Sequence, residues 1–457
     1  MRSRKADLRR RVNGNVAIRF TRLDLTSYAG LELLRSFLDK FEFVARLRRR
    51  LKSVDPGADY PSADLVRVVV AMLVVGARRL SHVRYLASDP VIQRFTELRK
   101  LPSDRTLSRW LSRCKAPVRA ALLSFMMELI GDSLRPLKLR RLTIDVDGTV
   151  LSTGLQVERA FRGYNPHHRK VPSYYPITAY LAQTGHLLSV RNRSGNVHDG
   201  KASMQFLRDL YNDLRTIAPK ATLEVRLDGA FFRREIVAWL EKRAEYAIRV
   251  PFYQWIDLKG IVALRERWKP VADGIDGFFA KVYLAPWKRD LKVAIYRKKV
   301  FHETHRNYQL DLYDPSNGTW EYSAITTNKQ IGLKALWEFL AGRGTHEKVT
   351  GQLKTGFAFD AIPTLDYAAN STWQILSVLA HNLVTSFQIV ISAPRFKTTP
   401  KRTTLFLLKS IHTLRYEFLN RAAILQRPAG RSTLTLADNQ ATRQVFTRIV
   451  DKLARAA

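Results

Sequence analysis

Two aspartates stand directly before glycines at the ends of stretches that alternate apolar and polar residues. Asp147 lies in such a stretch at 141–150, and Asp228 ends another at 221–228. Alternation with period two predicts strands. Carboxylates at the carboxyl ends of strands, beside a glycine that lets a substrate approach, are where α/β folds commonly place their chemistry. The alternative for each aspartate is to cap the turn that follows its strand.

A third acidic residue lies between two basic residues further along the chain. On a helix, Arg343, Glu347 and Lys354 share one narrow stripe, on which Leu340 also lies. The carboxylate could bind a metal ion while the cations bind the oxygens of a metal-bound phosphate. The alternative is a solvated ladder of salt bridges, which is the usual role of a charged stripe.

The spacing of these residues carries a resemblance to a known family. Arg343, Glu347 and Lys354 reproduce the last three members of a Tyr-Arg-Glu-Lys signature, and Leu340 stands at the tyrosine position. That signature is typical of cut-and-paste transposases of the DDE type. The chain therefore resembles a bacterial insertion-sequence transposase, a family with an RNase H-like core.

Segments around the two aspartates add to this resemblance. The sequence DVDGTV at 145–150 resembles the family's first-acid motif, and RLDGAFF at 226–232 resembles the second. The stretch at 163–200 is also similar to the sequence between the two acids in this group. Asp145 and Asp147 share a strand face. The family's Asp-small-Thr pattern favours Asp147, which leaves Asp145 as a neighbour, and the residues alone leave the choice open.

The resemblance implies a role for each of these residues. Asp147, Asp228 and Glu347 would be the catalytic residues and would bind two Mg²⁺ ions, for which Mn²⁺ would substitute. Arg343 and Lys354 would bind DNA phosphates. In related enzymes an aromatic residue of the insertion holds a flipped base, for which Trp320 or Tyr322 is a candidate here. Packing within a strand is the alternative for both aromatic residues.

The elements that position these residues give the expected fold class: an α/β RNase H-like catalytic core with a β-rich insertion, preceded by an all-α DNA-binding region. In the core, sequence patterns predict three strands, a helix, a strand, a helix and a strand. The expected segments are a helical DNA-binding region at 1–138, the first part of the core at 139–251, the β-rich insertion at 252–330, the second part of the core at 331–394, and a DNA-contacting or dimerisation segment at 395–457.

One helix of the N-terminal region has a basic face. The stretch at 104–113 places Arg105 and Arg109 away from its apolar stripe. A DNA-contacting helix of a helix-turn-helix-like unit is one interpretation, and a solvated face of a bundle helix is the other.

The composition bounds the class of partner. The chain has 457 residues, with 77 Lys and Arg against 40 Asp and Glu, and a formal net charge of +37. Such an excess repels itself unless a polyanion neutralises it, so nucleic acid is the expected partner. The single cysteine excludes a disulfide framework and a cysteine-based zinc finger, and suits a reducing cytoplasm. An uncharged stretch at 367–394 contains polar residues that are costly in lipid, which predicts a buried helix.

Together these patterns predict a DNA transposase. It would bind terminal inverted repeats and target DNA, cleave and transfer strands as a homodimer in the DNA complex, and work in the bacterial cytoplasm at the nucleoid. Two alternatives are an RNase H-like nuclease without strand transfer and a non-catalytic DNA-binding protein derived from a transposase.

Overall fold

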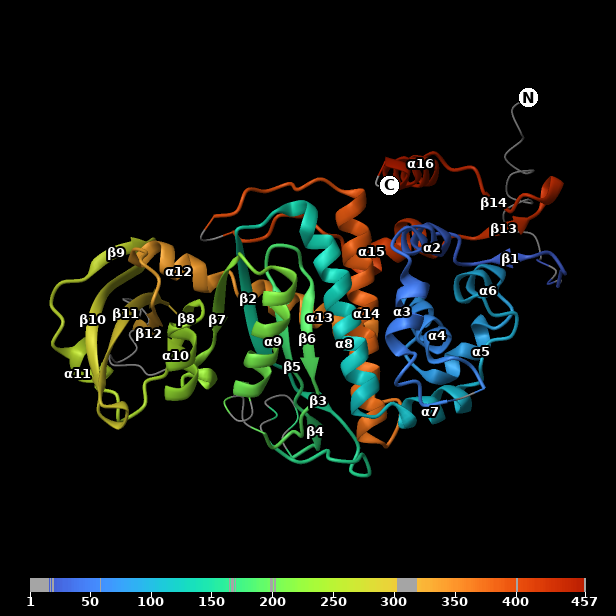
Figure 1. The fold of residues 1–457 in the computed structure, drawn as a ribbon. Coiled ribbons are helices and arrows are strands. Elements are labelled where there is room, and N and C mark those ends of the chain that lie inside the picture. Colours follow the sequence, from blue (N-terminus) through green and yellow to red (C-terminus); the bar gives the residue numbers. More distant parts are fainter. Residues whose placement is uncertain are drawn as a thin grey trace.

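One large mixed sheet organises the protein (Figure 1). The computed structural model describes residues 16, 18, 20–57, 59–163, 165, 168, 170–197, 200, 203–301, 319–399 and 402–455. Within this part of the chain, nine strands pair in the order β6-β5-β2-β7-β8-β12-β11-β10-β9. Their bounds are β2 Arg141–Gly148, β5 Ile177–Leu181, β6 Leu187–Arg191, β7 Thr222–Leu227, β8 Glu245–Val250, β9 Lys269–Ala272, β10 Ile275–Leu284, β11 Arg289–Val300 and β12 Thr319–Thr327.

Strand β2 is the centre of the core half of this sheet. It pairs antiparallel with β5 on one side and parallel with β7 on the other, and β8 continues parallel to β7. Parallel neighbours need a crossover, because the chain must return to the same edge. The helices α9 (Ser203–Ile217) and α10 (Arg234–Glu241) precede β7 and β8 and supply these crossovers. The predicted order of strands and helices in the core is confirmed.

Both faces of β2 are buried, which alternation alone would not predict. Leu142, Ile144 and Val146 pack in the main apolar core. On the other face, Thr143 and Asp145 are buried as well. Buried polar groups of this kind need partners, and the partner of Asp145 bears on the site described below.

The strands of the β-rich insertion extend the core sheet. β12 pairs antiparallel with β8, and β11, β10 and β9 follow outward in antiparallel pairs. The antiparallel pairing agrees with the pattern of short aromatic-rich runs in the sequence. One of those runs, YQLDLYD at 308–314, lies outside the described residues. α11 (Leu258–Ala263) precedes β9.

Two long helices, α8 (Ala116–Leu134) and α14, lie between the sheet and the other N-terminal helices (Figure 1). α14 (Tyr367–Ile391) packs against α8, β6 and the N-terminal helices α4 and α7. Nearly all of α14 is buried, and its Asn382 forms hydrogen bonds in both directions with the backbone of Leu187. The expected buried helix is therefore confirmed. In the part of the chain that the structure describes, no helix has the length and apolarity needed to cross a membrane.

The N-terminal region is mainly helical, with one short exception. Strand β1 (Leu25–Thr26) pairs with β13, which joins this region to the C-terminal part of the chain. The expectation of an all-α region therefore needs this correction. The two-residue strand β1 forms only by pairing with β13, which lies far away in the sequence. The helices here are α2 Leu31–Lys40, α3 Phe43–Leu51, α4 Ser62–Val75, α5 Val83–Leu86, α6 Pro90–Thr96, α7 Asp104–Arg113 and α8 Ala116–Leu134.

Smaller elements complete the fold. β13 also pairs with β14, and β3 pairs with β4 beside the sheet. The remaining bounds are β3 Leu151–Ser152, β4 Ser173–Tyr174, α12 Leu333–Ala341, α13 Gly344–Phe357, α15 Ile411–Leu414, β13 Ala423–Gln426, β14 Thr433–Leu436 and α16 Gln440–Arg455.

The stripe expected on one helix keeps its three charged residues together on α13 and its N-cap, whereas Leu340 lies in the preceding helix. α12 ends at Ala341 and α13 begins at Gly344, so Leu340 and Glu347 belong to different helices. Gly342 and Arg343 keep helical backbone angles at the junction. The extension of one helix back to Leu340 was wrong, because the glycines on both sides of Arg343 disfavour a continuous helix.

Candidate active site

The two aspartates predicted at strand ends lie at the same edge of the sheet. β2 and β7 are parallel neighbours in which Asp145 lies opposite Arg226. Asp147 and Asp228 each come two residues further along, where these strands end. Their side chains are 25% and 32% exposed, so a solute can reach both.

Each carboxyl group has one oxygen on the backbone and one beside a shared cation. The Oδ1 atoms of Asp147 and Asp228 accept hydrogen bonds of 3.0 Å from backbone N–H groups, of Gly148 and Ala230 respectively. Nη2 of Arg343 lies 2.8 Å from Oδ2 of Asp147 and 3.8 Å from Oδ2 of Asp228. Turn capping and a functional role are thus compatible, because capping uses only Oδ1.

Arg343 is a buried cation at the start of α13. Its side chain is 15% exposed, and its Nε has no hydrogen-bond partner among the described residues. Burial acts to lower the pKa of Arg343, but the charges of Asp147 and Asp228, with smaller contributions from Asp145 and Glu347, raise it overall. A guanidinium with an unsatisfied N–H beside two carboxylates is suited to bind an anionic oxygen, such as that of a phosphate.

Glu347 lies one helical turn beyond Arg343 and is exposed. Its charge is close enough to contribute to the raised pKa of Arg343. Among the described residues, no group of three or more His, Cys, Asp or Glu side chains is arranged to hold a metal ion. Asp147 and Asp228 offer carboxylate oxygens at one edge, and such oxygens are the ligands that Mg²⁺ prefers. The aspartate pair therefore fits a divalent cation, and Glu347 is not assembled with it here.

Lys354 and Leu340 lie near the site in different surroundings. Nζ of Lys354 donates a hydrogen bond of 3.1 Å to the carbonyl of Val150, just beyond β2. Burial lowers the pKa of this amine. Leu340 packs at the border of a small apolar cluster that includes Leu336 and Phe339. Leu340 therefore has a packing role at the position of the signature tyrosine.

Asp145, the other candidate for the first acid, is fully buried. It and Arg226 are both 0% exposed, and both of its carboxyl oxygens accept hydrogen bonds from the guanidinium of Arg226, at 2.5 and 2.7 Å. A carboxylate with both oxygens engaged inside the sheet is not available to a substrate. The geometry therefore favours Asp147 as the functional acid.

His346 fixes the first turn of α13 to the sheet, a role that the sequence did not reveal. The side chain is buried and stacks on Tyr180 of β5, with ring centroids 5.3 Å apart and planes 7° apart. Its Nε2 lies 3.0 Å from Oγ1 of Thr178, which pairs with Asp147 across the two strands. Burial lowers the pKa of His346 to about 4, so the ring is neutral at neutral pH. A stack against a strand residue is a long-range contact that spacing along the chain cannot indicate.

The aromatic residues proposed for base stacking are packed into strand β12. Tyr322 is buried, and Trp320 lies under the guanidinium of Arg297. The exposed aromatic pair near the site is Tyr253 and Trp255, whose stacked rings have centroids 5.9 Å apart. These two residues follow β8 in a loop. From the sequence, aromatic residues of the predicted strands were expected in this role instead.

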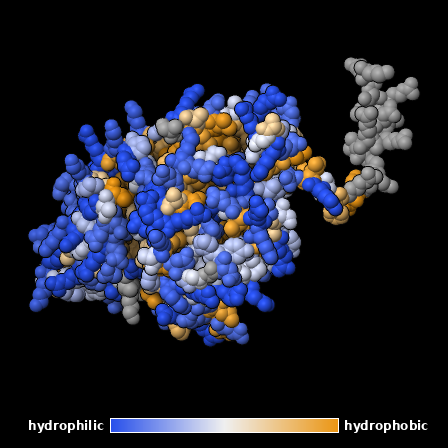
Figure 2. All heavy atoms as spheres, turned by 45° about the vertical axis from the view of Figure 1, so that its right-hand side comes forward, coloured by the Kyte–Doolittle hydropathy of each residue, from blue (hydrophilic) through white to orange (hydrophobic). Residues whose placement is uncertain are grey.

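The basic face of α7 is exposed as expected. Leu107, Trp110 and Leu111 are buried, and Ser103 caps the helix by accepting a hydrogen bond from the backbone of Thr106. The basic side chains on the outer face are Arg105 and Arg109, whose guanidinium groups form no hydrogen bond or ion pair with other described residues. Hydrophilic side chains cover most of the molecular face in Figure 2. These arginines are thus available for contact with a polyanion.

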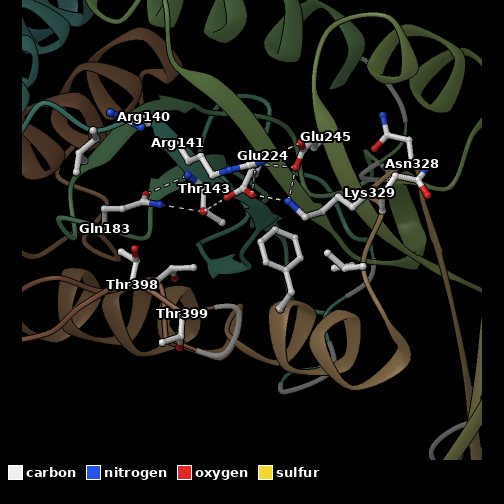
Figure 3. A pocket seen from close by; sticks show the side chains of 15 residues that line it. Arg140, Arg141, Thr143, Gln183, Glu224, Glu245, Asn328, Lys329, Thr398 and Thr399 are labelled. Atoms are coloured by element: carbon white, nitrogen blue, oxygen red, sulfur yellow. Dashed lines mark hydrogen bonds and ion pairs between the residues drawn. The ribbon is translucent and has the colours of Figure 1, made fainter.

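A cavity of about 610 Å³ lies at the opposite edge of the sheet, where β2, β7 and β8 begin (Figure 3). Four of its charged groups pair with one another. Nζ of Lys329 bonds to both Glu224 and Glu245, and Arg141 lies 2.8 Å from each of the same two carboxylates. Thr143 donates a further hydrogen bond of 2.7 Å to Glu224. This network connects the starts of β2, β7 and β8, while the exposed Arg140 lines the same cavity outside the network.

Comparison with known proteins identifies the family. The family model described as "Transposase DDE domain group 1" matches residues 9–457. No curated protein matches the chain. One similar solved structure is the cryo-electron microscopy structure of the piggyBac transposase synaptic complex with hairpin DNA. It has 12% sequence identity and a TM-score of 0.43, over 94% of this chain and 85% of that one. Because the family model spans nearly the whole sequence, the chain belongs to the DDE transposase domain group 1 family.

Proposed function

We propose that this protein is a DNA transposase that binds the terminal inverted repeats of an insertion sequence and catalyses metal-dependent strand cleavage and strand transfer. The observation that carries the proposal is the pair of Asp147 and Asp228 at adjacent strand ends, with Arg343 beside the second oxygen of each. Membership in a DDE transposase family supports the reaction class.

The catalytic core is proposed to be RNase H-like. In support, β2 is central: it pairs antiparallel with β5, which pairs antiparallel with β6, and on its other side it pairs parallel with β7, which pairs parallel with β8. The proposed bacterial group with the Tyr-Arg-Glu-Lys signature rests on the spacing of Arg343, Glu347 and Lys354. Since Leu340 packs against apolar neighbours, any phosphate contact of the signature tyrosine is absent from this version of the site.

Asp147, Asp228 and Glu347 are proposed to hold the metal ions, with Mg²⁺ as the natural cation and Mn²⁺ as a substitute. When bound, these ions supply an activated water or 3′-hydroxyl and stabilise the leaving oxygen of an in-line displacement. The backbone N–H groups of Gly148 and Ala230 keep the two aspartates oriented by holding their Oδ1 atoms. Glu347 is exposed on the first turn of α13, so its carboxylate is accessible to a cation.

Arg343 is proposed to change partners during the reaction. Without substrate it offsets part of the negative charge of the two aspartates. Cations on the carboxylates would release its guanidinium to bind a DNA phosphate. Lys354 would support the same phosphate path from the next turns of α13, close to its present contact with Val150.

DNA is proposed to reach the site across basic and aromatic surfaces. Arg105 and Arg109 on α7 would contact phosphates of the terminal repeat, and the net charge of +37 supports a long polyanionic partner. The stacked Tyr253 and Trp255 offer a surface for an unpaired base. Joining two DNA ends in one event requires two sites, so a homodimer is proposed in the DNA complex.

The test is cleavage and joining of duplexes that carry the element's ends, with Mg²⁺, by the wild type and by Glu347→Gln. We expect the variant to bind the ends as the wild type does while losing both cleavage and strand transfer. Equal activity of the two proteins would reject the assignment of Glu347. Cleavage without joining by the wild type would identify a nuclease, and binding without Mg²⁺-dependent cleavage would identify a DNA-binding protein.

A further inference from the structure

Arg226 connects the centre of the sheet to the helix that precedes the site. Its Nε and Nη2 donate hydrogen bonds to the two carboxyl oxygens of Asp145, and its Nη1 donates one of 2.8 Å to the carbonyl of Phe339. The side chains of Arg226 and Asp145 are fully buried. A buried arginine with all three nitrogens engaged has one fixed geometry, since a planar guanidinium cannot rotate without losing a bond.

The contact with Phe339 lies in the last turn of α12. Carbonyl groups there lack partners within the helix, and a cation at the C-terminal end of a helix interacts favourably with the helix dipole. The ring of Phe339 lies under the same guanidinium, 5.3 Å from its central carbon. Arg226 thus fixes the end of α12 through both the backbone and a side chain.

Gly342, the first residue after α12, has no room for a side chain. A Cβ atom at this position would lie 2.4 Å from Nη1 of Arg226. The backbone φ of Gly342 is −58°, which any residue adopts, so the approach of Arg226 is what requires a glycine. The next residue is Arg343, whose guanidinium reaches Asp147.

We propose that Arg226 is a positioning residue for the active site. By binding the carbonyl of Phe339, it fixes the junction of α12 and α13 relative to the sheet. The backbone positions of Arg343 and Glu347 depend on this junction. Two aspartates two residues apart on β2 then pair with two arginines: Asp145 with the internal Arg226, and Asp147 with Arg343 at the edge. The expected effect on catalysis rests on the proposed function, whereas the effect on the junction does not.

The test compares Gly342→Ala with Gly344→Ala. An added methyl at Gly342 displaces the Arg226 guanidinium, whereas one at Gly344 meets nothing within 4 Å. Amide hydrogen exchange at 339–346 in the protein without DNA is expected to accelerate about tenfold in Gly342→Ala, and to stay at or below the wild-type rate in Gly344→Ala. At saturating DNA, the cleavage rate of Gly342→Ala is expected to fall on the order of tenfold to a hundredfold. The DNA concentration for half-maximal rate should not change.

A second variant guards against a folding defect in the first. Arg226→Lys keeps a charge for Asp145 but cannot also reach the carbonyl of Phe339, so it should reproduce the exchange and rate changes of Gly342→Ala. The proposal is overturned if Gly342→Ala and Arg226→Lys both show wild-type exchange at the junction. It is also overturned if Gly344→Ala accelerates exchange as much as Gly342→Ala does. If the wild type does not cleave DNA, the proposed function fails, and exchange alone decides the role of Arg226.

Discussion

At the scale of single residues, the candidate site holds a cation beside its two aspartates before any substrate binds. Arg343 lies beside one oxygen of Asp147 and one of Asp228, while backbone N–H groups bind the other two oxygens. Two carboxylates at one edge would otherwise repel each other in a partly buried place. The arginine therefore stabilises the arrangement on which the proposed chemistry depends.

Loss of either aspartate should abolish the reaction while leaving DNA binding intact. Asp147→Asn and Asp228→Asn are each expected to lower the cleavage rate by about a thousandfold, because several kcal/mol of charge stabilisation by a bound cation are lost. The matched control is Asp273→Asn, at an exposed position between β9 and β10. Cleavage assays at saturating DNA check this prediction, and a normal rate in either site variant would contradict it.

Removal of the arginine should make the carboxylates more available to a cation. In Arg343→Ala, the affinity of the DNA-free protein for Mn²⁺ is expected to rise about tenfold, because a positive charge 2.8 Å from Asp147 is gone. Isothermal titration calorimetry measures this affinity. Lys354→Ala is the control, since its amine bonds to the backbone of Val150, and it should leave the affinity near that of the wild type. Weaker Mn²⁺ binding in Arg343→Ala would show that the guanidinium supports the cation.

Residue types and spacing predicted that Asp147 and Asp228 lie at strand ends, but they did not predict the ion pair between Arg343 and Asp147. Asp145 and Asp147 look equivalent in a strand pattern, and only the opposing Arg226 distinguishes them by burial. The contact of His346 could not be predicted, because its stack on Tyr180 joins residues far apart in the chain. Long-range contacts of this kind depend on strand order, which local patterns do not contain.

At the scale of elements, α14 carries polar groups through the centre of the protein. His381 of α14 lies beside Asn382, and His186 lies 3.0 Å from Ser386 of the same helix. Burial, with the nearby His381, lowers the pKa of His186 to about 3, and burial lowers the pKa of His381 to about 4. Both rings are therefore neutral in the folded protein at neutral pH.

These histidines predict a loss of stability in mild acid. Their pKa values are lower in the folded than in the unfolded protein, so the unfolded state binds more protons as the pH falls below about 6.5. At pH 5 each histidine should reduce the free energy of unfolding by about 2 kcal/mol relative to pH 7.5. Urea unfolding at the two pH values measures the loss. The loss should shrink by about 2 kcal/mol in His186→Gln and stay unchanged in His412→Gln, at an exposed position. An unchanged loss in His186→Gln would contradict the assignment.

The junction of α12 and α13 shows where helix periodicity reaches its limit. Spacing placed Leu340 and Glu347 on one stripe of a single helix, but the helix is interrupted between them at Gly342 and Arg343. The sequence predicted helical structure across this region, and the boundary between α12 and α13 lies where Arg226 approaches the backbone from another strand.

At the scale of the whole molecule, the positive charge is the property that the sequence predicts most directly. Arg105 and Arg109 lie on an exposed helix face, in a region that packs on α14 away from the sheet. The double variant Arg105→Ala/Arg109→Ala is expected to weaken DNA binding. It should also reduce the slope of log affinity against log salt by about 2, one for each lost phosphate contact.

Fluorescence anisotropy across a salt series measures this slope. Arg135→Ala, at the far end of the long helix α8, is the matched control and should leave the slope unchanged. An unchanged slope in the double variant would assign α7 to a solvated face of the helical region.

The order of strands and helices in the core could be predicted because alternation and helix signals are strong there. The path of the insertion could not. Its strands were expected as a segment set into the core, whereas hydrogen bonding of β12 to β8 joins them to the same sheet. Edge-to-edge pairing between segments is decided by backbone groups, which are the same in every residue and leave little trace in the sequence.

The shared sheet sets the distance between the proposed site and the outermost strand. From β2, which carries Asp147, to β9 at the far edge there are six strand spacings. At about 4.8 Å each, they span roughly 29 Å. Along one DNA strand this is the length of about eight nucleotides. Backbone hydrogen bonds connect each pair of neighbouring strands, so this distance is fixed. If a duplex bound at β9, the proposed function would place the cut at a constant distance from that contact.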